Sequence, residues 1–415
     1  MISISRDGQA CLNALEVMPG LRYIKKIVKT QILEDQDELN YSIKSKRDWS
    51  GLLPEVPPRL FDYQQEVHDL VIKKFKCGSA ALLSLPTGAG KTRTAVNIAL
   101  TLLAKGVIKK VVWIAPSIEL VDQAIGALRE TWNQSARFHG LVYGSLGESN
   151  QHRVQFSFGT VQSAAKRHRE LLFCKDTLLV FDEAHQAAAR TYSNIISSAR
   201  KKGSFALGLT ATPGRSNENE LNELVYLFAS HLIIPSCLGN HPVTALRDRN
   251  VLSQLEIVNC LQSNSVGVSF VDNLQSFLEE LRKRTSASGI GFAKSIEQAY
   301  LAAGAMSALG FLSEVISHDI PILKRQEKIH NLRAGKVQWL WNVELLSTGI
   351  DIPSLSSVAL LTRIKSAILY EQILGRVSRG PAVGGSESSL VFDLCGNSAA
   401  FGDACSYSRF LKSDW

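Results

Sequence analysis

The sequence lacks any long run of apolar residues. A membrane-spanning helix needs about 18 consecutive apolar residues, and no segment of the chain offers them. The first twenty residues also lack the basic region and continuous apolar run that mark a signal peptide. From these absences we expect a soluble, cytoplasmic protein with no membrane partner.

Paired cysteines are also absent. The 7 cysteines are an odd number, lie far apart along the chain and include no CxxC pair. A disulfide framework or a structural zinc site needs cysteines at short, regular spacings. The pattern therefore favours a reducing compartment and predicts neither kind of cross-link.

Low-complexity tracts and short repeats are missing as well. The 415 residues are 45% hydrophobic and 20% charged, a composition typical of a globular protein with roughly two or three domains. The formal net charge is +8 and the sequence pI is about 9.1. This mild basic excess favours a nucleic-acid partner, although many ordinary enzymes are equally basic.

The N-terminal segment, residues 1–55, has a mixed composition. It contains a basic run (22–29), an acidic run (34–38) and a second basic run (44–47), and the Pro-rich stretch LLPEVPPRL (52–60) follows. Because Pro restricts its own backbone and that of the preceding residue, this stretch predicts a domain boundary. The basic runs suit either duplex DNA or a protein partner, and the sequence does not identify one.

Short apolar runs recur in two regions and indicate buried strands. The first region contains SAALLSL (79–85), KVVWIAP (110–116), TLLVFDE (177–183) and FALGLTA (205–211), and the second contains GIGFAKS, FLSEVIS, KVQWLWNV, SSVALLT and SSLVFDL. Continuous rather than alternating hydrophobicity is typical of parallel strands covered by helices on both faces. We therefore expect an α/β fold with an accessory segment at 1–55 and two similar domains at 56–214 and 215–415.

A phosphate-binding loop is predicted at LPTGAGKT (85–92), which follows an apolar strand and precedes a helical run. Its glycines let backbone amides turn toward a phosphate, and the helix N-terminus adds partial positive charge. The lysine then reaches the β- and γ-phosphates, and the last threonine ligates Mg²⁺. The general pattern begins with Gly where this chain has Leu85. The predicted nucleotide-binding residues are Thr87, Gly88, Gly90, Lys91 and Thr92.

Two adjacent carboxylates follow the strand in LLVFDEAHQ (178–186). Open α/β sheets bind ligands at the carboxyl ends of their strands. There Asp182 can hold Mg²⁺ through its water shell, and Glu183 can activate the water that attacks the γ-phosphate. The alternative is a strand end that is merely capped by acidic residues.

Together, DEAH (182–185) and PTGAGKT (86–92) resemble the superfamily 2 helicases of the DEAD/DEAH-box type. The resemblance covers roughly residues 58 to 400 and is greatest to bacterial and phage DNA-repair and restriction-type ATP-dependent helicases. It implies two tandem RecA-like domains, ATP and Mg²⁺ as cofactors, and hydrolysis coupled to nucleic-acid unwinding or translocation.

Four further segments resemble first-domain motifs of this family: FDYQQ (61–65), IAPSIELVDQA (114–124), GTVQSA (159–164) and LTATPGR (209–215). The first implies that Gln64 contacts the adenine base, although the family often has Arg where Phe61 stands. The second and third imply that Ser117 and Thr160 contact one nucleic-acid strand. The fourth resembles the motif that couples hydrolysis to strand grip and implies that Thr210 and Thr212 are coupling residues; His185, the last residue of DEAH, lies between the ATP site and this motif in the family and is a further coupling candidate.

In the second domain, GFAKSIEQA (291–299) resembles the fourth motif and implies phosphate contacts by Lys294 and Ser295. LLSTGIDIP (345–353) resembles the fifth motif. It implies a strand contact by Thr348 and nucleotide contacts by Gly349 and Asp351.

Arg376 and Arg379 stand three positions apart, a spacing that predicts one shared helix face. Two such arginines alone indicate only a solvated face. The segment QILGRVSRG resembles the sixth motif, however, and implies arginine fingers that act on ATP held by the first domain, with Gln372 as a coupling residue. A guanidinium in that role is worth ~10³–10⁵ in rate.

The motifs TATPGR and TVQS resemble DNA-directed members of the family, and FDLCGNSAAFGD (392–403) is similar to a segment of some DNA-repair helicases. We therefore expect duplex or branched DNA rather than RNA. One alternative is a DEAH-type RNA helicase, although those usually carry large C-terminal domains and this chain stops at Trp415. Another is a non-unwinding clamp that ATP switches, although the intact catalytic residues disfavour an inactive ATPase.

Overall fold

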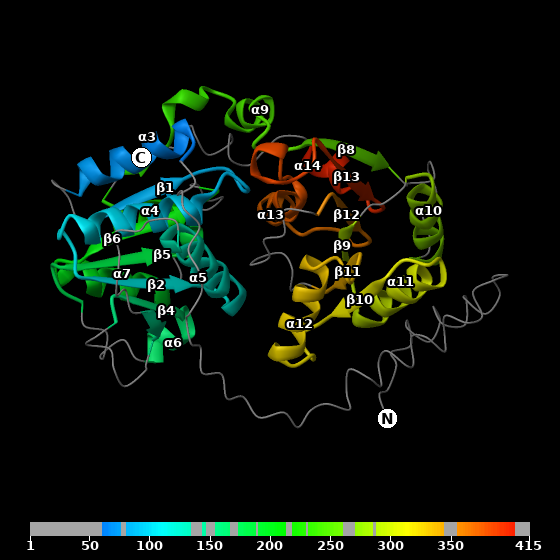
Figure 1. Ribbon diagram of the computed structural model, residues 1–415, viewed down its shortest axis with the longest axis horizontal. Helices are drawn as coiled ribbons and strands as arrows, with labels where there is room; N and C mark the ends of the chain where they lie inside the picture. Colours follow the sequence, from blue (N-terminus) through cyan, green and yellow to red (C-terminus); the bar gives the residue numbers. More distant parts are fainter. Residues whose placement is uncertain are drawn as a thin grey trace. The chain divides into compact units, whose positions relative to one another are not determined.

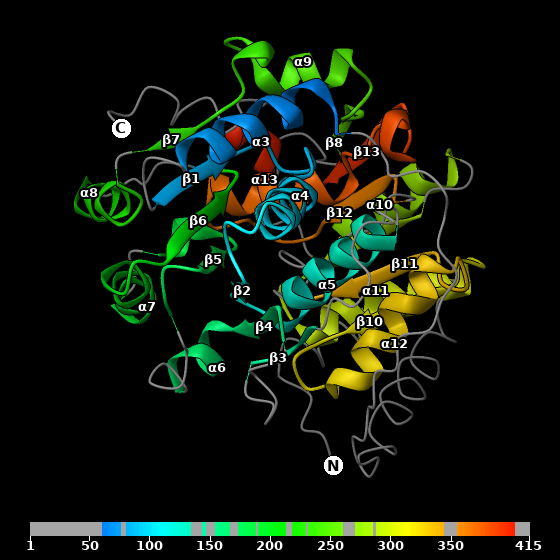
Figure 2. The same cartoon turned by 60° about the vertical axis from the view of Figure 1, so that its left-hand side comes forward.

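The computed structural model describes residues 60–75, 80–133, 143–146, 154–166, 173–187, 190–212, 218–229, 231–259, 270–284, 288–343 and 355–402. The chain divides into two compact units, and the boundary between Leu246 and Arg247 falls within α9 (Pro242–Asp248). Figures 1 and 2 show a sheet flanked by helices in each unit. Within the described residues, no helix has the length and apolar character needed to cross a bilayer.

The N-terminal unit contains a seven-stranded sheet in the order β3-β4-β2-β5-β6-β1-β7. Every strand pair in it is parallel. The strands are β1 (Ala80–Ser84), β2 (Lys110–Ala115), β3 (Tyr143–Ser145), β4 (Phe156–Thr160), β5 (Thr177–Phe181), β6 (Phe205–Thr210) and β7 (Leu232–Ile233). The helices are α3 (Asp62–Lys74), α4 (Lys91–Ala104), α5 (Ile118–Asn133), α6 (Val161–Lys166), α7 (Arg190–Lys201) and α8 (Glu218–Leu227).

The C-terminal unit contains a six-stranded parallel sheet in the order β10-β11-β9-β12-β13-β8. Its strands are β8 (Gln254–Asn259), β9 (Gly289–Phe292), β10 (Ser313–Ile316), β11 (Trp339–Asn342), β12 (Ser357–Leu360) and β13 (Ser388–Asp393). Its helices are α10 (Phe270–Arg282), α11 (Ile296–Ala308), α12 (Ile322–Arg333), α13 (Ala367–Val377) and α14 (Asn397–Phe401). Two parallel sheets flanked by helices confirm the predicted α/β fold.

The boundary between the units lies later in the chain than the 214–215 boundary expected from the sequence. β7 pairs with β1, and Leu224, Leu227 and Phe228 join the apolar core of the N-terminal sheet. Gly208 in β6 makes room for this packing, because a Cβ there would lie 2.5 Å from the Phe228 ring. Burial of these side chains therefore holds residues 218–246 with the N-terminal unit.

The core of the C-terminal unit is built on large aromatic side chains. Trp339 and Trp341 of β11 are fully buried and meet Phe277 of α10 in edge-on contacts, with ring centroids 5.5 and 5.7 Å apart. Gly291 of the neighbouring β9 leaves space for the Trp341 ring, which a Cβ would overlap. This packing anchors the central strands that support the C-terminal unit's carboxyl edge.

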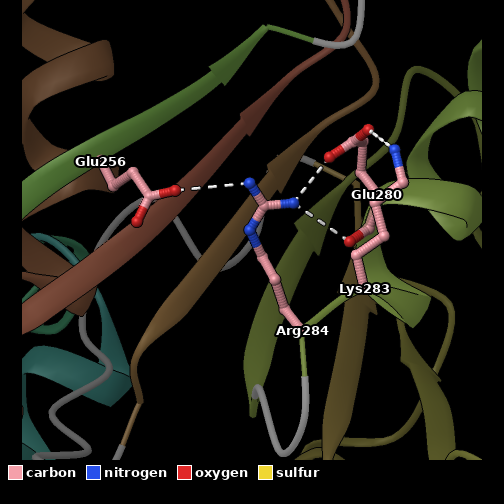
Figure 3. A network of polar contacts seen from close by, with 4 residues as sticks. All are labelled: Glu256, Glu280, Lys283 and Arg284. Carbon is pink, nitrogen blue, oxygen red and sulfur yellow. Dashed lines mark hydrogen bonds and ion pairs between the residues drawn. The ribbon is translucent and has the colours of Figure 1, made fainter.

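A polar network ties the edge strand β8 to the end of α10 (Figure 3). Arg284 donates hydrogen bonds to Glu256 of β8 at 3.3 Å and to Glu280 of α10 at 2.6 Å, and Lys283 also pairs with Glu280. The Arg284 guanidinium lies 5.9 Å from the Phe392 ring centroid. Hydrogen bonds from Lys283 and Arg284 lower the pKa of Glu280, and the bond to Glu280 raises the pKa of Arg284.

Candidate active site

Three predicted motifs emerge from neighbouring strands of the N-terminal sheet. β5, β6 and β1 lie side by side in parallel, so their carboxyl ends share one edge. The loop 85–92 follows β1, the acidic pair follows β5, and Thr210 ends β6. Parallel α/β sheets place ligands at this edge. The fold therefore brings the predicted nucleotide residues together from segments up to 125 positions apart along the chain, from 85 to 210.

The loop after β1 has the backbone shape of an anion cradle. Gly88 and Gly90 have φ values of 86° and 82°, the left-handed region that favours glycine. α4 begins at Lys91, so the unpaired amides of its first turn and its positive dipole end lie at this loop, with Thr92 in that turn. The Lys91 Nζ donates to the Leu85 carbonyl at 3.4 Å.

Leu85 occupies the position where the general loop pattern has Gly. Its side chain is fully buried, and its amide donates to the Thr210 carbonyl at 3.2 Å. Leu85 is absent from the residues with positive φ in the described chain. The position therefore needs no glycine here, because the backbone follows the sheet into the loop and the side chain joins the core.

Gln64 of α3 lies against the phosphate loop. Its Nε2 donates to the Ala89 carbonyl at 3.0 Å, and the Tyr63 hydroxyl donates to the same oxygen at 3.0 Å. Its Oε1 accepts from the Phe61 amide at 3.1 Å. A Cβ on the neighbouring Gly90 would overlap the Gln64 amide, so glycine permits this close approach. The structure thus attaches α3 to the loop, and the predicted contact with adenine stays a prediction.

Glu66 anchors the other side of α3, a role that sequence reasoning missed. Its carboxylate accepts from the Ser236 amide at 2.8 Å, the Ser236 hydroxyl at 2.6 Å and the Cys237 amide at 3.1 Å. Burial alone would raise the pKa of Glu66, but these hydrogen bonds outweigh it and lower the pKa to about 2. The partners are 170 residues away in sequence, so no local signal marks them.

The acidic pair after β5 is buried at the sheet edge. Asp182 and Glu183 are 2% and 7% exposed. Asp182 Oδ1 accepts from the Glu183 amide at 3.0 Å, and Glu183 adopts a left-handed φ of 49°. His185 Nδ1 lies 3.1 Å from Glu183 Oε2. Buried carboxylates beside a phosphate loop are the oxygen ligands that Mg²⁺ bound to a nucleotide requires, so the residues present fit ATP with Mg²⁺.

The predicted coupling residues Thr210 and Thr212 form a tight turn after β6. The Thr210 hydroxyl accepts from the Thr212 amide at 3.0 Å and donates to the Thr212 carbonyl at 3.1 Å. Among the described residues, the buried Thr212 hydroxyl has no hydrogen-bond partner. The Thr210 carbonyl also accepts a hydrogen bond from the Leu85 amide at the start of the phosphate loop. This bond connects the loop directly to the turn.

Ser117 and Thr160 lie on the other half of the same edge. They follow β2 and end β4, which pair in register at Ala115 and Thr160. The Ser117 hydroxyl accepts from Leu120 at 3.4 Å at the start of α5, and the Thr160 hydroxyl accepts from Ser163 at 3.3 Å. The predicted strand contacts are thus separated from the phosphate loop by β5 and β6.

In the C-terminal unit, Lys294 and Ser295 follow β9 at the carboxyl edge. Lys294 is exposed, whereas the Ser295 hydroxyl caps α11 by accepting from the Gln298 amide at 3.3 Å. The predicted residues Thr348, Gly349 and Asp351 lie outside the described residues.

The prediction that Arg376 and Arg379 share a helix face is wrong. α13 ends at Val377, so Arg376 lies in its last turn while Arg379 forms an antiparallel bridge with Leu252. Ser378 is the residue that caps the end of the helix, and its amide and hydroxyl both donate to the Leu374 carbonyl, at 3.0 and 2.6 Å. Gln372 and Arg376 are buried, at 7% and 9% exposure.

The glycine-rich segment after the arginines fixes the Arg379 backbone. The Arg379 carbonyl accepts a hydrogen bond from the Ser386 amide at 2.9 Å, and a Cβ at Gly385 would overlap the same carbonyl. A Cβ at Gly380 would overlap the Asn250 carbonyl. Glycines therefore let this segment close around Arg379 and set the position from which its side chain extends.

Comparisons with known proteins agree with this arrangement. Residues 58–215 match the family model described as "Type III restriction enzyme, res subunit", and residues 271–380 match "Helicase conserved C-terminal domain". The chain is 27% identical to "Putative helicase 22" of Sulfolobus islandicus filamentous virus, with 72% of this chain and 57% of that protein covered. It is 23% identical to the "Type I restriction enzyme EcoKI endonuclease subunit" of Escherichia coli, with 76% of this chain and 33% of that protein covered.

A third relative matches over more of its length. The "DNA 3'-5' translocase XPB2" of Sulfurisphaera tokodaii is 21% identical, with 88% of each chain covered. Two solved structures show the same fold. Dbp5 of S. cerevisiae bound to RNA and ADP BeF3 has a TM-score of 0.63 at 17% identity, covering 96% of this chain and 93% of that chain. The restriction-modification enzyme LlaBIII bound to DNA has a TM-score of 0.60 at 17% identity, covering 81% of this chain and 27% of that chain.

Proposed function

We propose that this chain is an ATP-driven motor on duplex or branched DNA, because residues 58–215 match the model of a restriction enzyme subunit and residues 271–380 that of a helicase C-terminal domain. We place this activity in DNA repair, recombination or defence. The observation that carries the proposal is the shared sheet edge of the N-terminal unit. There the loop with Lys91, the carboxylates of Asp182 and Glu183 and the turn at Thr210 occupy neighbouring strand ends.

In the proposed mechanism, the amides of the loop and Lys91 bind the phosphates of ATP, and Thr92 and Asp182 hold its Mg²⁺. When bound, Mg²⁺ neutralises charge that develops on the phosphates. Glu183 takes the proton of the attacking water, and its contact with His185 at 3.1 Å orients the carboxylate. The buried carboxylates of Asp182 and Glu183 are held by the Glu183 amide and by His185, so their side chains need to move less during the reaction.

The arginines supply the remaining charge stabilisation in this proposal. Arg376 and Arg379 act on the γ-phosphoryl group in the transition state. Their different backbone settings, helix end and β-bridge, give each guanidinium an independent anchor. Gln372, on α13 with Arg376, and the Thr210–Thr212 turn couple turnover to the grip on the polymer.

DNA is the proposed polymer for two reasons. The family model over residues 58–215 is that of a restriction enzyme subunit, and a relative that matches over 88% of its length is named as a DNA translocase. The likeness to the RNA-bound Dbp5 shows the fold alone. Ser117, Thr160, Lys294, Ser295 and Thr348 are proposed to contact the phosphate backbone, so binding tolerates any base sequence.

The test is steady-state ATP hydrolysis with no polymer, duplex DNA, forked DNA, single-stranded DNA and RNA. Stimulation by DNA and not by RNA is the expected result. If RNA alone stimulates hydrolysis, the polymer is RNA and not DNA. If the protein binds DNA but hydrolyses no ATP under any condition, an ATP-switched clamp is favoured.

A further inference from the structure

An exposed arginine, Arg363, stands at the carboxyl edge of the C-terminal sheet, in the loop between β12 and α13. The neighbouring strand β9 leads to the exposed Lys294. The two loops are joined, because the Leu361 amide donates to the Phe292 carbonyl at 2.9 Å. These adjacent loops thus present Lys294 from one and Arg363 and Lys365 from the other, and none of the motifs accounts for Arg363.

The backbone on both sides of Arg363 is held by one buried side chain. Asn397 Nδ2 donates to the Thr362 carbonyl at 3.1 Å, and Asn397 Oδ1 accepts from the Ile364 amide at 2.8 Å. Asn397 is 3% exposed, and Ile364 is buried beneath the loop. The side-chain amide of Asn397 therefore bonds to the backbone as a neighbouring strand would, and Arg363 lies between the two residues that it bonds, Thr362 and Ile364.

Asp393 at the end of β13 fixes the orientation of that amide. The fully buried Asp393 carboxylate accepts from Asn397 Nδ2 at 3.1 Å, from the Cys395 amide at 3.2 Å, and from the Ser398 amide and hydroxyl, both at 2.6 Å. A flipped Asn397 would turn its carbonyl toward the Asp393 carboxylate and the Thr362 carbonyl, and its NH₂ toward the Ile364 amide. Only one orientation satisfies every group.

A buried carboxylate is costly to desolvate. Three of the hydrogen bonds to Asp393 hold the start of α14, and the fourth orients the Asn397 amide that holds the loop around Arg363. Fixing the backbone of a residue costs conformational entropy, so an arginine on a pre-ordered loop loses less freedom when it binds an anion. Its planar guanidinium matches the geometry of a phosphate. A merely solvated surface arginine requires none of this support.

We propose that Arg363 contacts a phosphate of the bound polynucleotide strand beside Lys294, and that Asn397 and Asp393 are the positioning residues of this contact. The inference rests on the proposed function, because it names a further residue of the same polymer-binding edge. The contact reads no base, so it strengthens binding equally for all sequences.

The test compares the salt dependence of single-stranded DNA binding between the native protein and Arg363→Ala. Loss of one phosphate contact lowers the slope of log K against log salt by about 0.7. Arg333→Ala is the matched control, because Arg333 is equally exposed but lies in the last turn of α12, which runs back to the opposite sheet edge. We expect the slope to fall for Arg363→Ala, to remain native for Arg333→Ala, and to be restored by Arg363→Lys.

Positioning is tested with Asn397→Ala alone and combined with Arg363→Ala. If Asn397 acts through Arg363, the double variant binds no more weakly than Arg363→Ala, whereas additive losses would overturn the positioning role. Should Asn397→Ala fail to fold, Ser398→Ala takes its place in the same comparison of single and double variants; it removes the 2.6 Å hydroxyl bond to Asp393 and a 3.3 Å bond from the same hydroxyl to Asn259.

The failures of the two proposals are distinguishable. A native slope for Arg363→Ala, in a protein whose hydrolysis DNA still stimulates, overturns this inference and leaves the proposed function intact. A native protein that binds no polynucleotide overturns both.

Discussion

Replacement of Glu66 by Ala should destabilise the N-terminal unit and loosen α3 from it. The substitution removes three hydrogen bonds, from the Ser236 amide at 2.8 Å, the Ser236 hydroxyl at 2.6 Å and the Cys237 amide at 3.1 Å. A hydrogen bond to a charged group contributes about 1.5–3 kcal/mol, but Glu66 is partly exposed and water replaces much of the lost interaction. We expect a net loss of about 2 kcal/mol in the free energy of unfolding.

Thermal and urea unfolding measure this loss. For a domain of this size, about 1 kcal/mol shifts Tm by roughly 2–4 °C, so the expected decrease is about 4–8 °C. Ser236→Ala is the matched control, because it removes only the hydroxyl bond and should cost a fraction of that amount. Since α3 also carries Gln64, which holds the phosphate loop at Ala89, Glu66→Ala should also weaken ATP binding.

The effect should depend on pH with a defined sign. The pKa of Glu66 is about 2 in the folded protein against an ordinary 4.5, so the carboxylate stabilises the fold fully above pH 4.5 and less as the pH falls toward 2. The stability gap between the native protein and Glu66→Gln should therefore narrow from neutral pH to about pH 3. A stability gap of the same size at neutral pH and at about pH 3, or no gap at neutral pH, would show that the Glu66 carboxylate does not stabilise the fold through these hydrogen bonds.

Three other substitutions give direct predictions. Lys91→Ala should abolish ATP hydrolysis in a steady-state assay because the phosphates lose their cation, and residual native turnover would contradict its role. Arg379→Ala should retain ATP binding, measured with a fluorescent nucleotide, yet lower kcat by ~10³ or more; an equal fall in the control Arg333→Ala would exclude a finger role. Gly208→Ala should cost about 1–3 kcal/mol in unfolding experiments, because the new Cβ meets Phe228 at 2.5 Å, and an unchanged urea midpoint would argue against that packing.

The sequence predicted those strands whose burial is continuous. Every residue of β1 and β5 is buried, and both appear in the chain as uninterrupted apolar runs. β8 escaped notice because it is an edge strand with the polar sequence QLEIVN, in which most side chains are exposed or half-buried. β7 has only 2 residues, too few for any periodicity to show.

Other features depend on tertiary contacts that no local pattern encodes. α8 and its following residues belong to the N-terminal unit because Phe228 fits above Gly208, which local polarity near residue 215 does not reveal. The spacing of Arg376 and Arg379 suggested one helix face, but Ser378 ends the helix between them. Likewise, the bond from Asn397 to the Thr362 carbonyl spans 35 positions, so no local pattern indicates that the loop around Arg363 is held.

Triplex displacement shows whether this protein moves along duplex DNA, because it detects such movement without requiring strand separation. The native protein is mixed with a duplex that carries a labelled third strand, with ATP or without it, and Lys91→Ala is run in parallel. We expect ATP-dependent release of the third strand by the native protein and none by Lys91→Ala. Hydrolysis of ATP that DNA stimulates but that never displaces the third strand would contradict it.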